Sequence, residues 1–523
     1  MSTTLYRGGR VRSAADPFAT ALLVDGDTVA WVGTDQAAAA LGADLVVDLD
    51  DAWVAPAFVD AHVHATSTGL ALTGLDLTDA PSLAAALSRI EQAARDVRGG
   101  VLLGTGWDET RWPERRPPTA AELDRASYGG VVYLARTDVH SAVVSSALLA
   151  AAPQARAEAG FLPDGLVRQA AHHVLRRAAY GAITPAQRRR AQLSTLDRAA
   201  ELGIGCVHEC GGPEIGGEQD FLDLLALEHP VDVLGYWGEL HGADRARELG
   251  AVGAGGDLFL DGALGSHTAC LTSPYDDDEG SGFLYVGADE IEQHVTACTR
   301  AGLQAGFHAI GDGALNALFT AVARSAEIVG VPQLRALRHR IEHAELLTPA
   351  QVSSMAALGL VASVQPAFDA RWGGSEGMYV ERLGAERAAG MNPFAALAAN
   401  GVALALGSDA PVTPLDPWGT VRAAVRHRTP GSGLSARAAF AAHTRGGWRA
   451  VGDDVTGELV PGAPATFAIW RVDGELVVQT PDERVSSWST DPRAGVAGLP
   501  DLDGPDPVCV RTVVRGRDAT ARS

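Results

Sequence analysis

Residues 53–64 are Trp-Val-Ala-Pro-Ala-Phe-Val-Asp-Ala-His-Val-His, an apolar run that ends in two histidines. The first part, Trp53–Val59, has the length and composition of a buried β-strand. Successive side chains of an extended chain point to opposite sides, so His62 and His64 face the same side. The stretch therefore predicts a strand that is followed by a pair of potential metal ligands.

Further short apolar runs follow this strand, and helical patterns such as Thr184–Leu202 and Ala288–Ala301 separate them. Eight β units that alternate with helices predict an α/β fold, a parallel sheet closed into a TIM-like (β/α)8 barrel. The other expected strands are Gly205–His208, Val231–Trp237, Leu258–Asp261, Leu303–His308, Arg338–His343, Leu360–Gln365 and Val402–Asp409.

The two ends of the chain and one internal segment depart from this alternation. Short β-type runs near the ends are Ala21–Val24, Thr28–Gly33, Gly462–Trp470 and Cys509–Val514. The connection from about Leu70 to Tyr180 is too long for a simple crossover, so we interpret it as a subdomain inserted after the first barrel strand. We expect β-structure in residues 1–54 and 451–523, and the barrel in residues 55–450.

The composition restricts the kinds of partner that this chain can have. The net charge of −22 argues against nucleic acid and against an anionic membrane surface, because phosphate binding needs a basic face. The N-terminal residues lack the apolar region of a signal peptide, and no apolar run reaches transmembrane length. The five scattered cysteines do not form a disulfide framework. We expect a cytoplasmic protein that acts on a small molecule, and a homodimer is possible.

Potential metal ligands end several of the predicted strands. His308, His343 and Asp409 are the last residues of their apolar runs. His62 and His64 come shortly after the first apolar run. The carboxyl ends of barrel strands converge on one mouth, so these five side chains should meet there. A His-x-His pair alone is weak evidence, because histidines are often satisfied within cores. The combination predicts a metal site.

This set of residue types suits hydrolysis assisted by a metal ion. Imidazole favours zinc, and a carboxylate can complete a site that leaves a position for water. Such an ion lowers the pKa of coordinated water from about 15.7 toward 7. Asp409 could accept the proton and deliver it to a leaving nitrogen, and His343 could polarise a carbonyl or stabilise the developing oxyanion.

Several motifs resemble those of the amidohydrolase superfamily, over nearly the whole chain from about Leu5 to Gly516. Together they resemble the branch that holds N-substituted formamide deformylases. They are Ala55–His64, Gly106–Glu109, Asp261–Ser266, Gly306–Asp312, Arg340–Ala344, Ser363–Pro366 and Gly407–Pro411.

The resemblance implies a TIM-like barrel with a small β-sandwich built from both termini. It also implies hydrolysis of a C–N bond that is not a peptide bond. By motif position, the metal-site residues would be His62, His64, His308, His343 and Asp409.

One position departs from the pattern of the family. Related sequences usually have a lysine, which can be carboxylated to bridge two metals, where this chain has Asp257. Aspartate cannot form a carbamate, so the sequence favours one divalent ion, zinc, over two. Asp257 could still bind the ion directly, although its side chain is shorter than a lysine carbamate.

Other polar and aromatic residues are candidates for the substrate pocket, because insertions and loops after barrel strands lie on the active-site face. For each of them, an ordinary core or surface role is the alternative. They are Trp107, Arg136 and His140 in the inserted segment, and His208, Trp237 and His267 near predicted strand ends.

The leading functional hypothesis is hydrolysis of an amide or formamide by metal-activated water. The first alternative is a deaminase of a cyclic amidine or nucleobase-like substrate, which usually needs a glutamate near the histidine of the fifth strand. His308 is followed by Ala309-Ile310-Gly311-Asp312, which offers none. The second alternative is a metal-free barrel that binds a ligand or serves as a scaffold.

Overall fold

The computed structural model describes residues 2–97, 99–136, 141–479, 488–489 and 498–521. The chain divides into two compact units. The barrel unit contains residues 1–64 and 196–523, and the inserted unit contains residues 65–195. Each unit is described by itself below.

The barrel unit is built around an eight-stranded parallel sheet, as the sequence predicts. Nearly all side chains in these strands are buried, which explains why the strands are continuous apolar runs rather than alternating ones. In chain order the strands are β7 (Phe58–Val63), β13 (Ile204–Gly211), β14 (Asp232–Trp237), β15 (Gly253–Ala254), β16 (Gln304–Ala309), β17 (Arg340–His343), β18 (Val361–Val364) and β19 (Ala403–Leu406).

Backbone hydrogen bonds between the first and last strands close this sheet into a barrel. The amide of Asp409 donates to the carbonyl of His62 at 2.8 Å, and the amide of His64 donates to the carbonyl of Ala410 at 3.0 Å. A parallel bridge joins Val63 to Ala410. The closure therefore holds the His62–His64 pair beside Asp409.

The fourth strand lies earlier than the sequence suggests. We expected Leu258–Asp261, but the paired strand is β15, and the chain leaves it at Gly255 and Gly256. Gly256 has a φ of +81°, and a Cβ on Gly255 would come within 2.2 Å of the backbone of Gly306. The two glycines bend the chain at a close approach, which residues with side chains could not do.

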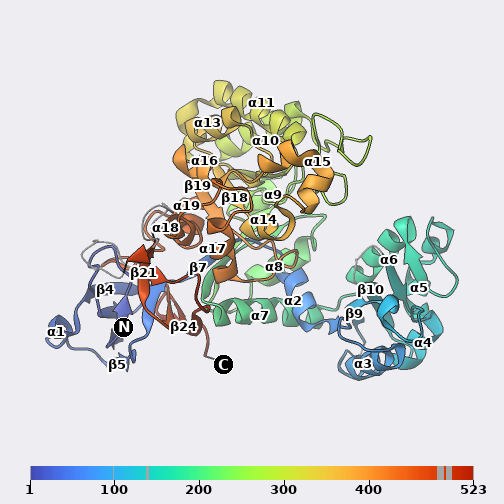
Figure 1. Cartoon of the computed structure of the whole chain (residues 1–523), viewed down its shortest axis with the longest axis horizontal. Helices are drawn as coiled ribbons and strands as arrows, with labels where there is room; N and C mark the ends of the chain where they lie inside the picture. The colour runs from blue at the N-terminus through green and yellow to red at the C-terminus, as the bar shows by residue number, and fades with distance from the viewer. Residues whose placement is uncertain (1, 98, 137–140, 480–487, 490–497, 522–523) are drawn as a thin grey trace. The chain divides into compact units, whose positions relative to one another are not determined.

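Helices follow the barrel strands and surround them (Figure 1). At the start of α13, the side chain of Thr348, which precedes the helix, and that of Gln351, which lies within it, form a capping box. The helices of the barrel are α8 (Glu218–Leu225), α9 (Ala243–Glu248), α10 (Ala288–Ala301), α11 (Asp312–Val329), α12 (Val331–Ala336), α13 (Pro349–Leu358), α14 (Pro366–Trp372), α15 (Met378–Ala389), α16 (Phe394–Ala399), α17 (Pro417–Val425), α18 (Ala436–Ala442) and α19 (Arg445–Ala450).

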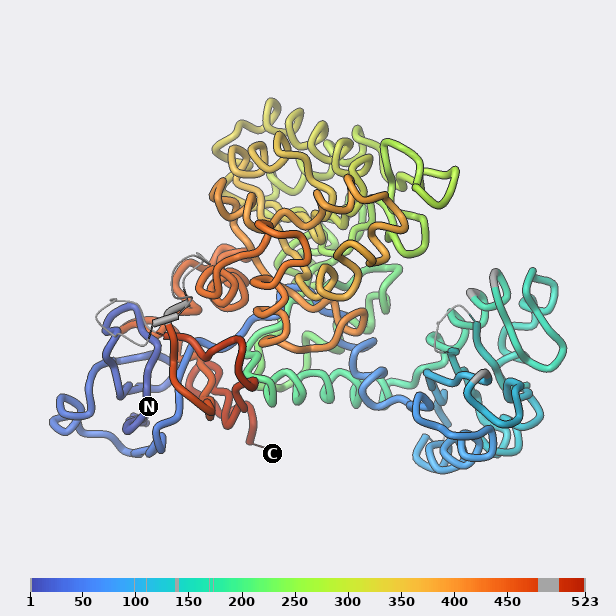
Figure 2. Tube along the Cα trace, in the orientation of Figure 1, coloured from blue at the N-terminus to red at the C-terminus, as the bar shows by residue number. Residues whose placement is uncertain are grey.

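Both ends of the chain contribute to sheets beside the barrel, where the blue and red segments lie together (Figure 2). The predicted first strand is divided, because β6 joins the terminal sheet and only β7 enters the barrel. The order of one sheet is β4-β3-β1-β5, and that of the other is β2-β6-β20-β24-β25. The bounds are β1 (Thr3–Arg7), β2 (Arg10–Val11), β3 (Ala21–Asp25), β4 (Thr28–Gly33), α1 (Asp35–Ala38), β5 (Leu45–Asp48), β6 (Trp53–Pro56), β20 (Phe467–Arg471), β24 (Val508–Val514) and β25 (Arg517–Asp518). A further small sheet contains β21 (Leu476–Gln479), β22 (Trp488–Ser489) and β23 (Leu499–Pro500).

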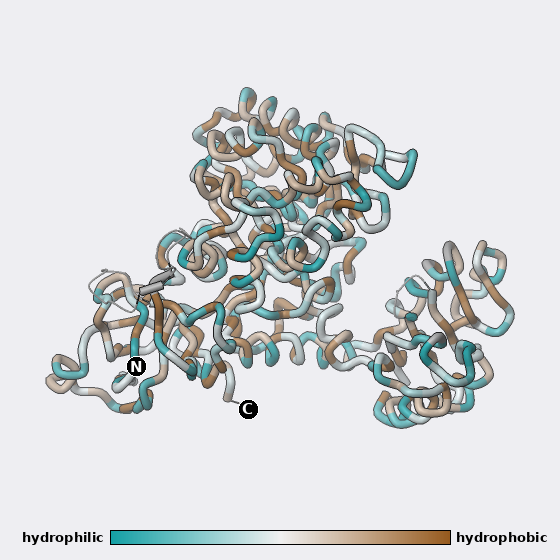
Figure 3. The backbone as a smooth tube through the Cα atoms, in the orientation of Figure 1, coloured by the Kyte–Doolittle hydropathy of each residue, from teal (hydrophilic) through white to brown (hydrophobic). Residues whose placement is uncertain are grey.

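The inserted unit has a five-stranded sheet of its own, in the order β12-β11-β10-β9-β8. It begins at Ala65 and ends at Thr195, wider at both ends than the expected residues 70–180. Its strands form hydrophobic, brown segments in Figure 3. Its elements are α2 (Ala65–Thr73), β8 (Leu75–Asp76), α3 (Leu83–Asp96), β9 (Val101–Trp107), α4 (Ala120–Ala126), β10 (Val131–Arg136), β11 (Ser141–Val144), α5 (Ser146–Ala151), β12 (Leu166–Arg168), α6 (Gln169–Gly181) and α7 (Pro185–Glu201), of which α7 continues into the barrel unit.

Among the described residues, no helix combines the length and the apolar composition that crossing a membrane requires.

Three histidines buried in the barrel unit predict how its stability depends on pH. Burial lowers the pKa of His294, His339 and His443 to about 4. His339 is held as a neutral acceptor, because its Nδ1 accepts the amide proton of Ala305 at 2.8 Å. The unfolded chain binds these protons near pH 6.5, so stability is fully present above that pH and falls as the pH drops toward 4.

We expect each of these histidines to lower the free energy of unfolding by about 1.4 kcal/mol per pH unit within that window. Denaturant unfolding of the wild type and of His339→Gln at several pH values measures the contribution of one of them. The pH slope of the variant should be shallower by that amount, and equal slopes would contradict the prediction.

Candidate metal centre

The structure brings the five predicted metal-site residues together at the carboxyl ends of the barrel strands. His62 lies near the end of β7 and His64 follows that strand, His308 lies in β16, His343 ends β17, and Asp409 follows β19. His343 and Asp409 have φ values of +69° and +54°. Residues with side chains adopt this left-handed region rarely, and such strain is typical of functional sites.

Asp257 lies at the centre of this group. Its Oδ2 is 3.4 Å from Nε2 of His62 and 3.1 Å from Nε2 of His64. Its Oδ1 is 3.4 Å from Nδ1 of His308 and 3.6 Å from Nε2 of His343. The carboxylate therefore lies within 3.6 Å of a ring nitrogen of each of the four histidines, despite its short side chain.

Asp409 completes the group on the side of the His-x-His pair. Its Oδ1 lies 3.5 Å from Nε2 of His62 and 3.3 Å from Nε2 of His64. Potential ligand atoms of these three residues lie within 4.8 Å of one another, as do those of His62, Asp257 and His343. The structure thus adds Asp257 to the candidate ligands that the motifs indicate.

Each of the four histidines has a partner outside the group for one ring nitrogen, which fixes its tautomer. The partner is an oxygen atom in every case, so that nitrogen carries the proton and the other nitrogen presents a lone pair to the centre. The contacts are His62 Nδ1 to Glu342 Oε2 (2.9 Å), His64 Nδ1 to the Cys210 carbonyl (3.1 Å), His308 Nε2 to the Gly262 carbonyl (3.4 Å) and His343 Nδ1 to Gln365 Oε1 (2.8 Å).

The atoms that face the centre are suited to a cation. His62 Nε2, His308 Nδ1, Asp257 Oδ1 and Asp409 Oδ1 are buried and have no hydrogen-bond partner among the described residues. Buried lone pairs and carboxylates without donors are costly, and a divalent ion would satisfy them together. The mixture of imidazole and carboxylate is a set of ligands that zinc accepts.

The charges of these residues also favour a bound cation. Burial alone lowers the pKa of His64, but Asp257 and Asp409 overcome it and raise that pKa well above its usual value. Burial alone raises the pKa of Asp257, but the imidazoles hold it well below its usual range. The site therefore attracts protons onto its histidines where a metal ion would replace them.

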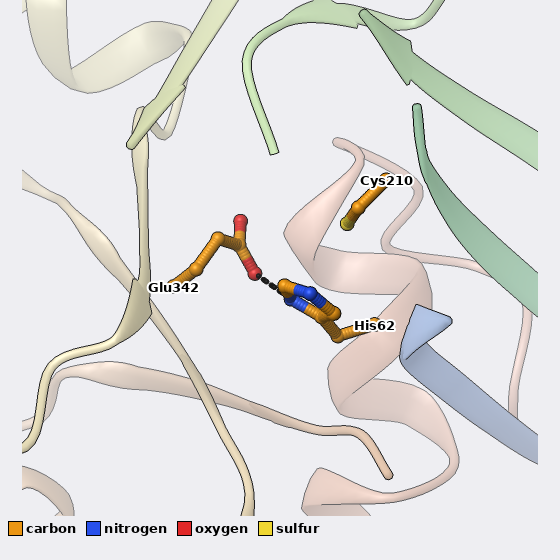
Figure 4. Close-up of side chains that lie close together, drawn as sticks. All are labelled: His62, Cys210 and Glu342. Carbon is orange, nitrogen blue, oxygen red and sulfur yellow. Dashed lines mark hydrogen bonds and ion pairs between the residues drawn. The ribbon is translucent and has the colours of Figure 1, made fainter. Parts of the chain in front are cut away.

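A buried ion pair positions the ring of His62. Glu342 lies between His62 and Arg340, whose guanidinium also donates to the Ala61 carbonyl at 2.7 Å and to Ser363 Oγ at 2.8 Å. Figure 4 shows the imidazole between Glu342 and Cys210. Although burial opposes its ionised form, Arg340 and His62 lower the pKa of Glu342 to about 2. The carboxylate is thus charged and fixes the tautomer of His62.

The Glu342→Gln variant should lose zinc affinity and stability together. We expect zinc to bind about 10- to 100-fold more weakly, because the partner that orients His62 loses its charge. The free energy of unfolding should fall by about 3–5 kcal/mol, because Arg340 keeps a buried charge without its counter-ion. Competition with a chelator and denaturant unfolding measure the two effects.

Ser363→Ala removes another partner of Arg340 and is the matched control. Zinc affinity that falls equally in both variants would contradict this role of Glu342.

A cavity of about 430 Å³ lies beside the candidate metal centre. His64, Asp257, His308, His343 and Asp409 form its polar floor. The rest of the wall consists of apolar side chains, the hydroxyl-bearing Ser266 and Tyr379, and one further carboxyl, that of Glu345. Burial raises the pKa of Glu345 to about 7, although the hydrogen bond from Tyr379 lowers that pKa.

The predicted pocket residues of the barrel unit do not line this cavity. His208 is buried at hydrogen-bond distance from Arg340, with 3.2 Å between Nδ1 and Nη1. The indole of Trp237 donates to Glu239 at 2.7 Å, and His267 is 3.0 Å from Asp277. These three residues have structural contacts where the sequence suggested contact with substrate, and a substrate role for them stays a prediction.

The candidates in the inserted unit belong to that unit's own structure. Trp107 packs in its hydrophobic core and donates to the Leu134 carbonyl at 2.9 Å. Arg136 forms ion pairs with Asp108 and Glu109. His140 lies outside the described residues. Their role in a pocket stays a prediction.

The sequence reasoning missed several polar residues that support the site. Glu342 and Arg340 lie two positions apart in β17, and this spacing could have indicated a shared inward face. Asp261 is fully buried and accepts the amide protons of Ile310 and Gly311. Asp60 accepts those of His62 and Ser408. Both carboxylates hold the loops that carry the candidate ligands.

Comparisons with known proteins agree with this geometry. The sequence model of the amidohydrolase family matches residues 45–518. The protein LONG AFTER FAR-RED 3 of Arabidopsis thaliana is 28% identical over 87% of this chain and 84% of its own. The N-substituted formamide deformylase of Arthrobacter pascens is 24% identical over 80% and 82%. The crystal structure of an uncharacterized metal-dependent hydrolase from Pyrococcus furiosus covers 89% of this chain and 98% of its own, with a TM-score of 0.76 and 26% identity.

Proposed function

Because this chain belongs to the amidohydrolase family and is a metal-dependent hydrolase, we propose that it hydrolyses a non-peptide carbon–nitrogen bond of the amide or formamide type. One observation carries the proposal. Four histidines with fixed tautomers direct their free nitrogens at two carboxylates, beside a cavity that can hold a small molecule. The deformylase from Arthrobacter pascens, by its name, acts on a bond of this type.

The ion that we propose is a single zinc, with His62, His64, Asp257 and Asp409 as its nearest ligands. His308 and His343 face the other oxygen of Asp257 and would hold a second ion if one bound. A bridge made from lysine carbamate is excluded, because the sequence contains no lysine. When bound, the ion supplies Lewis acidity that activates water and polarises a carbonyl group.

The residues of the chain have separate tasks in the proposed reaction. Water adds to the carbonyl carbon, and the carboxylate of Asp409 accepts the proton that the water loses. The C–N bond then breaks, and Asp409 delivers the same proton to the departing nitrogen, so that the products are a carboxylic acid and an amine. His343 donates its Nδ1 proton to Gln365 and presents a lone pair at Nε2, which supports a role as a potential metal ligand rather than as a donor to an oxyanion.

Metal analysis combined with a substrate screen tests this function. The purified chain is loaded with zinc, and its metal content per chain is measured. Hydrolysis of N-formyl, N-acyl, cyclic amide and cyclic amidine compounds is followed by the amino group or the ammonia that forms. We expect about one zinc per chain and turnover of at least one amide or formamide. A chain that holds no metal, or a zinc-loaded chain that releases only ammonia from cyclic amidines, would overturn the proposal.

A further inference from the structure

The wall of the cavity beside the candidate metal centre is mostly apolar. Beyond its polar floor, the lining of the cavity includes the side chains of Phe259, Ile310, Phe368, Trp372, Met378 and Tyr379. Phe368 and Trp372 pack edge to face, with ring centroids 4.7 Å apart. Such a wall accepts an apolar or aromatic body and gives a polar group on that wall a large influence on specificity.

Glu345 places one carboxyl group in this wall. Its side chain is 3% exposed, and the hydroxyl of Tyr379 donates to its Oε2 at 2.9 Å. The backbone of Glu345 is also fixed, because its carbonyl accepts the amide proton of Asn392 at 2.8 Å. Within the ranges that the structure describes, no arginine forms an ion pair with this carboxyl. The group is therefore held in place by a neutral donor rather than by an ion pair with arginine.

A buried carboxylate without a counter-ion is costly, and its cost is removed when a bound ligand supplies the opposite charge. The walls that flank Glu345 are aromatic, and aromatic faces attract cations as well as apolar groups. The chain as a whole carries a net charge of −22, which also favours cationic ligands over anionic ones. The net charge of the chain, the burial of Glu345 and the aromatic wall therefore all favour a ligand with a cationic group.

We propose that Glu345 determines specificity by pairing with a positively charged nitrogen group of the substrate. The substrate class is then an amide or formamide whose compact apolar body also carries an ammonium, amidinium or guanidinium group. This inference rests on the proposed function for the identity of the bond that is hydrolysed. Tyr379 is a positioning residue in this arrangement, because it acts on the ligand through Glu345.

Two isosteric probes test the pairing by binding affinity rather than by a reaction rate. Benzamidinium and benzamide have nearly the same shape, but only the first is a cation at pH 8. Titration calorimetry with the zinc-loaded chain gives the affinity for each probe. We expect benzamidinium to bind about 10- to 100-fold more tightly than benzamide, the range for a charged hydrogen bond. Equal affinities for the wild type would overturn the inference.

Two variants separate the carboxylate from the rest of the wall. Glu345→Gln should reduce the preference to less than about 3-fold while benzamide binds as before, and Glu345→Asp, which keeps the charge, should retain part of it. A preference that survives in Glu345→Gln would overturn the inference. If Glu345→Gln does not fold, Glu345→Asp is the second test: its shorter side chain should lower the preference below that of the wild type, and an unchanged preference would overturn the inference equally.

The outcomes for this inference and for the proposed function are distinguishable. A chain that prefers benzamidinium but hydrolyses no amide or formamide would refute the function and leave the recognition of a cation in place. A chain that hydrolyses neutral formamides and binds both probes equally would refute only the role of Glu345.

Discussion

The Asp409→Asn variant should lose almost all hydrolytic activity while it keeps the fold. We expect kcat/KM to fall by about 10²- to 10⁴-fold, the contribution of a general base, because an amide cannot accept the proton of the attacking water. The backbone of Asp409 already pairs with His62 across the barrel closure, so the exchange of one side-chain atom leaves that closure intact. Amide or formamide hydrolysis by the zinc-loaded variant measures the effect.

A matched control lies seven residues further along the chain. Asp416 caps α17 by accepting the amide proton of Gly419 at 2.9 Å, and asparagine is an equally good cap. Asp416→Asn should therefore keep full activity. Activity in Asp409→Asn that equals that of Asp416→Asn would show that the proton is accepted elsewhere.

The second large effect concerns Asp257. Asp257→Asn should lower the affinity for zinc by at least about 100-fold, because the four histidines lose the charge that they surround. Activity should disappear with the metal. Competition with a chelator and direct metal analysis measure the loss, and far-UV circular dichroism shows whether the barrel persists.

Asp369→Asn serves as the control for this change. Asp369 is as deeply buried as Asp257, and it accepts the backbone amide proton of Arg428 at 2.7 Å. Its Oδ1 lies 3.6 Å from Nε2 of His427, which is not one of the histidines of the candidate metal centre. Zinc affinity in Asp257→Asn that matches that of Asp369→Asn would mean that Asp257 is a structural carboxylate and that the ion is held by the histidines and Asp409 alone.

Much of the barrel could be predicted because its strands are buried on both faces and therefore appear as continuous apolar runs. The same argument places His308, His343 and Asp409 at one mouth, since residues at carboxyl strand ends must converge when the sheet closes. The pairing of Trp53–Pro56 with the terminal sheet was not predictable, because an apolar run does not indicate which of two sheets it joins. Nor did composition locate β15, a strand of two residues next to glycines.

The supporting residues were harder to predict for a different reason. Glu342 and Glu345 lie on either side of His343 in the chain. Nothing in their spacing indicates that Glu342 pairs with Arg340 or that Glu345 lines the cavity. Their roles depend on partners from other strands and helices, such as Tyr379 of α15. Contacts between residues distant in sequence are set by packing, which a single sequence does not reveal.

The absence of lysine from this chain has a consequence for how the metal centre is assembled. A centre built on a carbamate requires dissolved carbon dioxide, and its occupancy depends on the bicarbonate present while the protein matures. Here the carboxylate at the centre of the candidate ligands is Asp257, a side chain present as soon as translation ends. Assembly of the candidate centre should therefore proceed equally in degassed and in carbonated buffer.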